Sequence, residues 1–218
     1  MSRLRCLRTS IDAAAAYLGA EVAAPVAAPS CVVEGDQGVV MFEAGGRKRL
    51  RSMRWGFPRL TREMRVRGED PGIIGLVADL TNPMWEQMVV DPRYRCIIPI
   101  THFANPDGDA GKKTRTWFSL NDTAVMAWAG FCRNIPDVGP CYAGMTMEAN
   151  SAVMPYNDRM PVLLEQGEIE RWLRGAIDDV IAFQFRRPVA AARIEVIHTD
   201  SPWRGGDPPP AATQIDLI

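Results

Sequence analysis

The sequence lacks the features that define several common classes of protein. None of its 218 residues belongs to an apolar run near the roughly 18 that a membrane span needs, and the N-terminus has no signal-peptide core. The formal net charge of −1 argues against a uniformly basic nucleic-acid binder and against an acidic disordered chain. We therefore expect a globular protein without a membrane partner, large enough to build a stable core without disulfides or structural metal.

Cysteines are few, odd in number and widely spaced. None forms a CxxC pair, which argues against a disulfide framework or a zinc site, and we predict no cofactor. Four of them lie among apolar neighbours and are interpreted as buried thiols, with Cys6 as the exception. A reducing, cytoplasmic setting follows. The five are Cys6, Cys31, Cys96, Cys132 and Cys141.

Histidine is also rare, and generic catalytic motifs are absent. The only two histidines are His102 and His198, and no GxSxG, HExxH, Walker or dinucleotide-binding pattern occurs. His102 shares strand parity with Ile98 and Ile100, which favours a buried, hydrogen-bonded histidine. His198 ends a strand before a polar loop, so it lies either in a groove or in solvent.

Short apolar runs outnumber helical patterns. Ser10 and Gly19 bound a predicted helix over 11–18, and two more helices are expected over 168–174 and 176–185. Because the strands do not alternate with helices, we predict one α+β domain over 1–218, with a mostly antiparallel, barrel-like sheet and a few peripheral helices. The predicted strands are 31–33, 38–42, 49–55, 95–103, 115–120, 124–131, 141–147 and 192–198.

Positive charge is concentrated in residues 47–67. Nine of these 21 residues are basic and only Glu63 is acidic, so the segment carries +8 and the rest of the chain −9. One interpretation is a solvated strand face followed by a loop. The other is a groove for a polyanion, because arginine binds phosphate oxygens in pairs and stacks on bases. Trp55, between Arg54 and Gly56, is either a stacking platform for single-stranded nucleic acid or a core aromatic.

Several short strings, in a particular order, resemble the SOS-response-associated peptidase (SRAP) family. The resemblance extends over about residues 6–198. It implies an α+β fold around a barrel-like core and a positively charged groove for single-stranded DNA. The strings are Trp55-Gly56-Phe57-Pro58, Arg95-Cys96-Ile97-Ile98-Pro99, Ala129-Gly130-Phe131, Thr146-Met147-Glu148-Ala149-Asn150, Asp158-Arg159-Met160-Pro161-Val162-Leu163 and Trp172-Leu173.

Members of this family crosslink to abasic DNA through an N-terminal cysteine, and peptidase activity is inferred for release of the preceding residue or propeptide. The family pattern Met-Cys-Gly-Arg is placed on Arg5-Cys6-Leu7-Arg8, which implies Cys6 as nucleophile and Arg8 as a phosphate contact. The crosslink is a thiazolidine, formed when an aldehyde condenses with an α-amine and its neighbouring thiolate. Cys6 can therefore form this ring only after residues 1–5 have been removed, because only then does it carry a free α-amine.

The departures from the family pattern fall on catalytic positions. The resemblance places the acid/base glutamate at Asn105 and the histidine before Asp-Arg-Met-Pro at Asn157, and an amide cannot act as a general acid or base. The family segment Asn-Ala-Arg-x-Glu is replaced near residues 77–81, where Asp79 reverses the charge of the arginine and Asn82 follows.

Three functions remain open at this point. The first is an SRAP-like DNA-damage protein, for which a phage-related origin is one option, that binds single-stranded or abasic DNA and crosslinks through a processed Cys6. The second is a catalytically inactive DNA-binding module, and the third is an interaction protein that uses its basic segment on an acidic partner. The expected catalytic residues are Cys6, Asn105 and Asn157, and the expected DNA contacts are Arg8, Arg54, Trp55 and Arg159.

Overall fold

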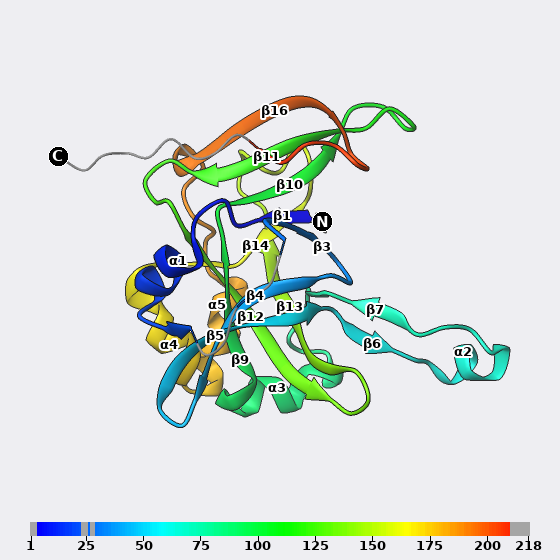
Figure 1. Ribbon diagram of the computed structural model, residues 1–218, viewed down its shortest axis with the longest axis vertical. Coiled ribbons are helices and arrows are strands. Elements are labelled where there is room, and N and C mark those ends of the chain that lie inside the picture. Colours follow the sequence, from blue (N-terminus) through cyan, green and yellow to red (C-terminus); the bar gives the residue numbers. More distant parts are fainter. Residues whose placement is uncertain (1–3, 23–25, 27–28, 210–218) are drawn as a thin grey trace.

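A sheet that closes on itself forms the centre of the fold. The computed structural model describes residues 4–22, 26 and 29–209 (Figure 1). Five strands follow one another around the ring, and the parallel pairing of the first strand with the last closes it. In ring order these strands are β5 (Arg47–Trp55), β4 (Gln37–Ala44), β9 (Arg95–Ile100), β12 (Met126–Ile135) and β13 (Gly139–Glu148).

Shorter strands extend the ring to a nine-stranded sheet. All of its pairings are antiparallel except those that β13 makes with β5 and β8 and that β2 makes with β5. The barrel-like, mostly antiparallel α+β architecture predicted from the sequence is confirmed. The added strands are β2 (Glu21–Val22), β8 (Leu76–Val77), β14 (Arg159–Pro161) and β15 (Leu163–Leu164).

A second, five-stranded sheet lies across one end of the ring, at the top of Figure 1. Its hydrogen-bonded order starts at the last strand of the chain and includes the first, so segments far apart in sequence lie side by side. The order is β16 (Ile194–Pro202), β11 (Thr114–Leu120), β10 (His102–Asp107), β1 (Leu4–Cys6) and β3 (Cys31–Val33).

The helices cover the ring or lie outside it. The predicted first helix is confirmed as α1 (Ile11–Leu18), with Ser10 accepting from the Ala13 amide and Gly19 in the left-handed region. The remaining helices are α2 (Arg62–Arg67), α3 (Glu86–Val90), α4 (Ile169–Arg174) and α5 (Ile177–Phe185), with single 3-10 turns at Pro83–Trp85, Pro92–Tyr94, Gln166–Glu168 and Ala191–Arg193. No helix within the described residues is long and apolar enough to cross a membrane.

The predicted single strand over 95–103 is wrong: the structure divides it between the two sheets. Residue Thr101 leaves the ladder after β9, and its amide donates to the Cys6 carbonyl at 2.8 Å. His102 then starts β10, with its Nδ1 2.8 Å from the Thr101 hydroxyl. The expectation of a buried, hydrogen-bonded His102 is confirmed, because only 2% of this residue is exposed.

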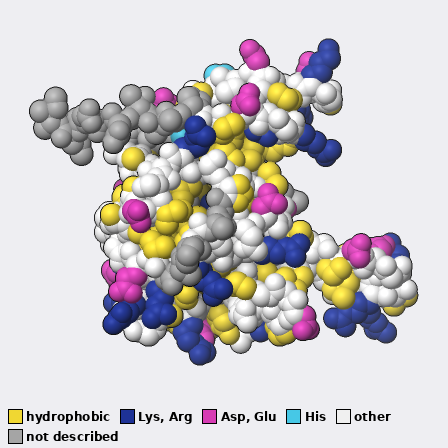
Figure 2. Space-filling view, in the orientation of Figure 1, with side chains coloured by type: hydrophobic (Ala, Val, Ile, Leu, Met, Phe, Trp, Pro, Cys, Tyr) yellow, Lys and Arg dark blue, Asp and Glu magenta, His cyan; other side chains and the backbone are white. Residues whose placement is uncertain are grey.

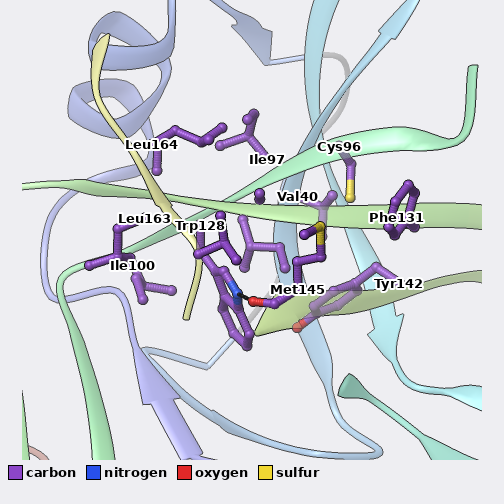
Figure 3. Packing of buried hydrophobic residues seen from close by; sticks show 14 of the residues in the cluster. Val40, Cys96, Ile97, Ile100, Trp128, Phe131, Tyr142, Met145, Leu163 and Leu164 are labelled. Atoms are coloured by element: carbon purple, nitrogen blue, oxygen red, sulfur yellow. Dashed lines mark hydrogen bonds between the residues drawn. The ribbon is translucent and has the colours of Figure 1, made fainter. Parts of the chain in front are cut away.

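The core fills the ring with large side chains (Figure 3). Trp128 points inward and donates from Nε1 to the Met145 carbonyl at 2.6 Å. Gly144 leaves room for that ring, since a Cβ atom there would overlap the Trp128 indole. These contacts between buried groups stabilise the closed sheet and involve none of the exposed charged side chains.

One expectation about the cysteines is wrong. Cys6 and Cys31 face each other across β1 and β3 and form a disulfide. The other three are free and buried, as predicted: Cys96, Cys132 and Cys141. The register of two antiparallel strands produces the pair, and no spacing rule in the sequence encodes it. The argument for a reducing compartment from an absence of disulfides no longer applies.

Candidate nucleic-acid interface

A hairpin arm extends from the body of the molecule (Figure 1). Its base is a two-stranded sheet of β6 (Phe57–Arg59) and β7 (Gly72–Ile74), and α2 forms its tip. Thr61 caps α2 by accepting from the Met64 amide, and Gly68 ends it in the left-handed region at φ 66°. One of the two interpretations of the basic segment from sequence placed a loop here, although this pair of cap residues is a helix signal.

The arm carries cations without protein partners. Arg59, Arg62 and Arg65 are exposed, and none of their guanidinium groups forms a hydrogen bond or ion pair with a described residue. Arg67 differs, because it lies 3.5 Å from Glu63 and 3.3 Å from Glu69. In Figure 2 the Lys and Arg side chains gather on one side of the arm and the acidic ones on the other. We call Arg59, Arg62 and Arg65 the arm arginines.

Two cations at the other end of the basic segment are paired with carboxylates of the protein. Arg47 lies 3.6 Å from Glu21, and the Lys48 ammonium lies 2.5 Å from Glu170. The exposed Arg54 near the end of β5 has no carboxylate within ion-pair distance among the described residues. Arg49 and Arg51 on β5 likewise form no ion pair with a described residue. The cations that are paired within the protein are therefore those at the start of β5 and Arg67 on α2, and the unpaired ones extend from the middle of β5 along the arm.

Trp55 is a core residue in this structure. Its exposed fraction is 0%, and its Nε1 donates to the Gly75 carbonyl at 2.8 Å. The ring stacks on Tyr142 with centroids 6.2 Å apart and meets Trp128 edge-on at 5.8 Å. Neither face of the indole is open to a base. Of the two interpretations of Trp55 from sequence, the structure therefore agrees with the core aromatic.

A buried arginine completes this aromatic group. Arg5 on β1 is 1% exposed, donates from Nε to the Tyr142 hydroxyl at 3.1 Å and lies 5.6 Å from the Trp55 ring centroid. Burial raises the pKa of Tyr142 to about 12, so the phenol stays neutral and accepts from the cation. A Cβ at Gly38 would overlap the Arg5 guanidinium, which explains a glycine at that point of β4.

The two other predicted DNA contacts make hydrogen bonds inside the protein. Arg8 is half-buried, and its amide donates to the Thr101 hydroxyl at 3.0 Å. Arg159 donates to the Ala78 carbonyl at 2.8 Å and to the Thr146 hydroxyl at 2.9 Å. Arg159 thereby connects β14 and β13 to the segment after β8, so its guanidinium has a structural task whatever else it binds.

The predicted catalytic residues do not converge on one point. Cys6 pairs with His102 in the ladder, so these two side chains share a face of the sheet. Asn105 lies on the opposite face of β10, because it is three residues further on and side chains alternate. Cys6 is fully buried in a small outer cluster with Leu4 and Trp117.

Asn105 occupies an unusual position on the inner face. It is fully buried, and neither its amide nitrogen nor its oxygen has a hydrogen-bond partner. Asn157, from the loop before β14, is half-buried and accepts from the Arg159 amide at 3.1 Å. Within the part of the chain that the structure describes, neither side-chain amide is hydrogen-bonded to a titratable side chain.

A polar row that begins at Asn105 has no signal in the sequence, because its members lie on three different strands. Asn105 pairs with Thr116 and Thr116 with His198, so the three lie side by side across β10, β11 and β16. The His198 Nδ1 is 3.7 Å from Asp107 Oδ2, and its Nε2 is 3.4 Å from the Tyr156 hydroxyl. His198, for which the sequence left a groove or solvent open, is the exposed end of this row.

The fold and the arm define a class: an α+β protein with a closed sheet and a basic appendage. A family model described as SOS response associated peptidase (SRAP) matches residues 3–201. The chain belongs to the SRAP family, as the sequence resemblance predicted. No curated protein matches it.

Solved structures share the fold. A protein from Bordetella bronchiseptica superimposes with a TM-score of 0.73 at 21% identity, covering 90% of this chain and 98% of the other. One from Bacteroides thetaiotaomicron has a TM-score of 0.69 at 18% identity, covering 91% and 93%. A phage-related protein from Bordetella bronchiseptica also has a TM-score of 0.69, at 14% identity, covering 90% and 93%. At such identities the likeness establishes the fold alone.

Proposed function

We propose that this protein binds single-stranded DNA without a covalent bond, through the arm arginines and Arg54. One observation carries the proposal: exposed guanidinium groups without protein partners continue from the edge of the ring along the arm. Guanidinium groups bind phosphate oxygens in pairs, and membership of the SRAP family supports a role on DNA. The proposal assigns no stacking role to Trp55, which is buried in the core.

The buried position of the N-terminal strand argues against crosslinking by the intact chain. An amide nitrogen cannot form the imine that starts thiazolidine formation, and the Cys6 sulfur is engaged in the disulfide. Removal of residues 1–5 would free an α-amine, but it would also delete Arg5 and leave the buried Tyr142 hydroxyl without this donor. Residues 1–3 lie outside the described residues. Crosslinking by a processed chain is the second candidate function.

Salt-dependent binding tests the first candidate. Fluorescence anisotropy with a labelled oligothymidine should show an affinity that falls with salt, because each neutralised phosphate releases counterions. The double variant Arg62→Ala, Arg65→Ala should reduce the log–log slope by about 1.4 if each arginine neutralises one phosphate. Arg187→Ala is the matched control, since Arg187 is exposed but lies after α5. An unchanged slope in the double variant, or no binding at low salt, would refute the proposal.

Intact mass separates the two candidates. The wild-type chain, incubated with an oligonucleotide that carries one abasic site, should keep its own mass after denaturation. A chain that starts at Cys6, tested in parallel under reducing conditions, gives an adduct only if the covalent route operates. An adduct on the intact chain would contradict the noncovalent proposal directly.

A further inference from the structure

A cavity of about 400 Å³ lies where the arm joins the body. Its walls come from the arm, from the turn after β3, and from the segment that follows β8. The Gly75 amide donates to Glu34 Oε1 at 2.6 Å, and this bond holds the turn against the arm (Figure 1 shows β7 leaving the body beside this turn). The volume is within the range of small-molecule sites.

Three polar side chains of this cavity have hydrogen-bonding capacity to spare. The Arg59 guanidinium has no partner among the described residues. Asn82 accepts from the Met84 amide at 3.0 Å through its oxygen, so its amide hydrogens stay available. Asp79 receives two hydrogen bonds from Thr81 on Oδ1, at 2.9 and 2.6 Å. These bonds lower the pKa of Asp79, and its carboxylate is therefore an acceptor at neutral pH.

The mixture of groups selects among ligands. A free phosphate would meet two carboxylates, Glu34 and Asp79, and is disfavoured by like charge. A purely apolar ligand would make no use of the Arg59 guanidinium or of Asp79 Oδ2. A neutral planar ring with both donors and acceptors on its edge satisfies the set, and aliphatic side chains offer surfaces for its faces: Ile73, Ile74, Leu76 and Met84.

We propose that this cavity takes one unstacked nucleobase of the bound strand, with guanine preferred; the proposal rests on the strand binding proposed above. Arginine pairs with O6 and N7 of guanine in the commonest specific contact between proteins and bases. The Asp79 carboxylate accepts from N1–H and the 2-amino group of the same base, a set of donors that adenine, cytosine and thymine lack. Arg59 borders both the cavity and the arm, so a strand held by the arm arginines has a base within reach of it.

Binding to defined strands tests the base preference. An oligothymidine with one central dG should bind about tenfold tighter than the all-dT strand, the size expected for one good bidentate base contact. Asp79→Asn keeps an oxygen for Thr81 but loses the charged acceptor for N1–H and the 2-amino group, so it should reduce that preference, while the contact of Arg59 with O6 and N7 remains. Asp109→Asn, in the exposed turn after β10, is the matched control. A preference of wild-type size in Asp79→Asn would overturn the proposal.

A nucleoside titration keeps this test separate from the proposed function. Deoxyguanosine added to the whole protein should shift the methyl NMR signals of Ile73, Ile74, Leu76 and Met84, and thymidine should shift them less. Asn82→Ser, which retains the helix cap and removes the amide donor, should weaken the effect. If the strand binds but deoxyguanosine leaves these methyls unmoved, the cavity proposal fails and the strand-binding proposal stands. If no strand binds, the proposed function fails, and with it the cavity's role on DNA.

Discussion

The arm and the five-stranded sheet differ in how their polar side chains are used. The arm arginines are exposed, and their guanidinium groups have no partner among the described residues, in contrast to Arg67 on the same helix as two of them. On the sheet, two residues expected to be catalytic are buried, Cys6 in a disulfide and Asn105 in an enclosed position, and Arg5 is buried against Tyr142. The positive charge that is available for a ligand therefore lies on the arm, where it makes no contact that stabilises the fold. Stability and DNA binding should therefore respond to different substitutions.

The largest effect is expected in the aromatic core beside the arm. Trp55→Ala removes a fully buried indole and its bond to Gly75, and such truncations cost about 3–5 kcal/mol of unfolding free energy. Urea denaturation measures this loss. The protein that remains folded should bind oligothymidine with unchanged affinity. A stable variant with weakened DNA binding would instead support Trp55 as a stacking platform. It would also contradict the separation of stability from DNA binding.

Reducing the disulfide should destabilise the sheet and spare the arm. Cys6 and Cys31 are 25 residues apart, and closing a loop of that size stabilises a fold by ~3 kcal/mol. Denaturation of Cys31→Ala, or of the wild type with and without dithiothreitol, gives the difference. The salt slope of DNA binding should not change on reduction. Loss of DNA binding in parallel with the disulfide would show that the two regions are coupled.

The sheet should also lose stability in acid because of His102. Desolvation lowers the pKa of this buried histidine to about 4, whereas an unfolded histidine titrates near 6.5. The unfolded chain binds the extra proton between these values, so the unfolding free energy falls as pH drops from about 6.5 to about 4. The total is ~3 kcal/mol.

Two histidine variants isolate this effect. His102→Gln should flatten the pH dependence of stability between pH 6.5 and 4, even if it lowers stability overall. His198→Gln is the matched control because His198 is exposed. A wild-type profile that is flat over this interval would contradict the buried, neutral His102.

The sequence was a good guide where local pattern decides structure. The first helix follows from Ser10 and Gly19, whose capping chemistry is local. The family strings predicted the ring because they coincide with its strands, such as Arg95 to Pro99 in β9. Both inferences rest on residues close together in the chain.

What the sequence did not predict depends on pairing between distant strands. The bend at Thr101 follows Pro99 by two residues, but its position is set by a carbonyl of β1, which is distant in sequence. The disulfide depends on the β1–β3 register, and the opposite faces of Cys6 and Asn105 depend on the β1–β10 register. The polar row from Asn105 to His198 spans three strands, and its members are up to 93 residues apart in sequence. Counting positions along a family motif places residues in order but not on a face.

The smallest expected effect is on the arm itself. Arg65→Ala removes one exposed, unpaired guanidinium, so thermal stability should stay within about 0.5 kcal/mol of wild type. Its salt slope on oligothymidine should fall by about 0.7 if Arg65 neutralises one phosphate. Arg67→Ala is a demanding comparison, because Arg67 lies on the same helix but is already paired with Glu63 and Glu69. A smaller slope change for Arg67→Ala than for Arg65→Ala would show that DNA binding depends on unpaired guanidinium groups. Equal changes would show that the arm attracts DNA only through its total positive charge.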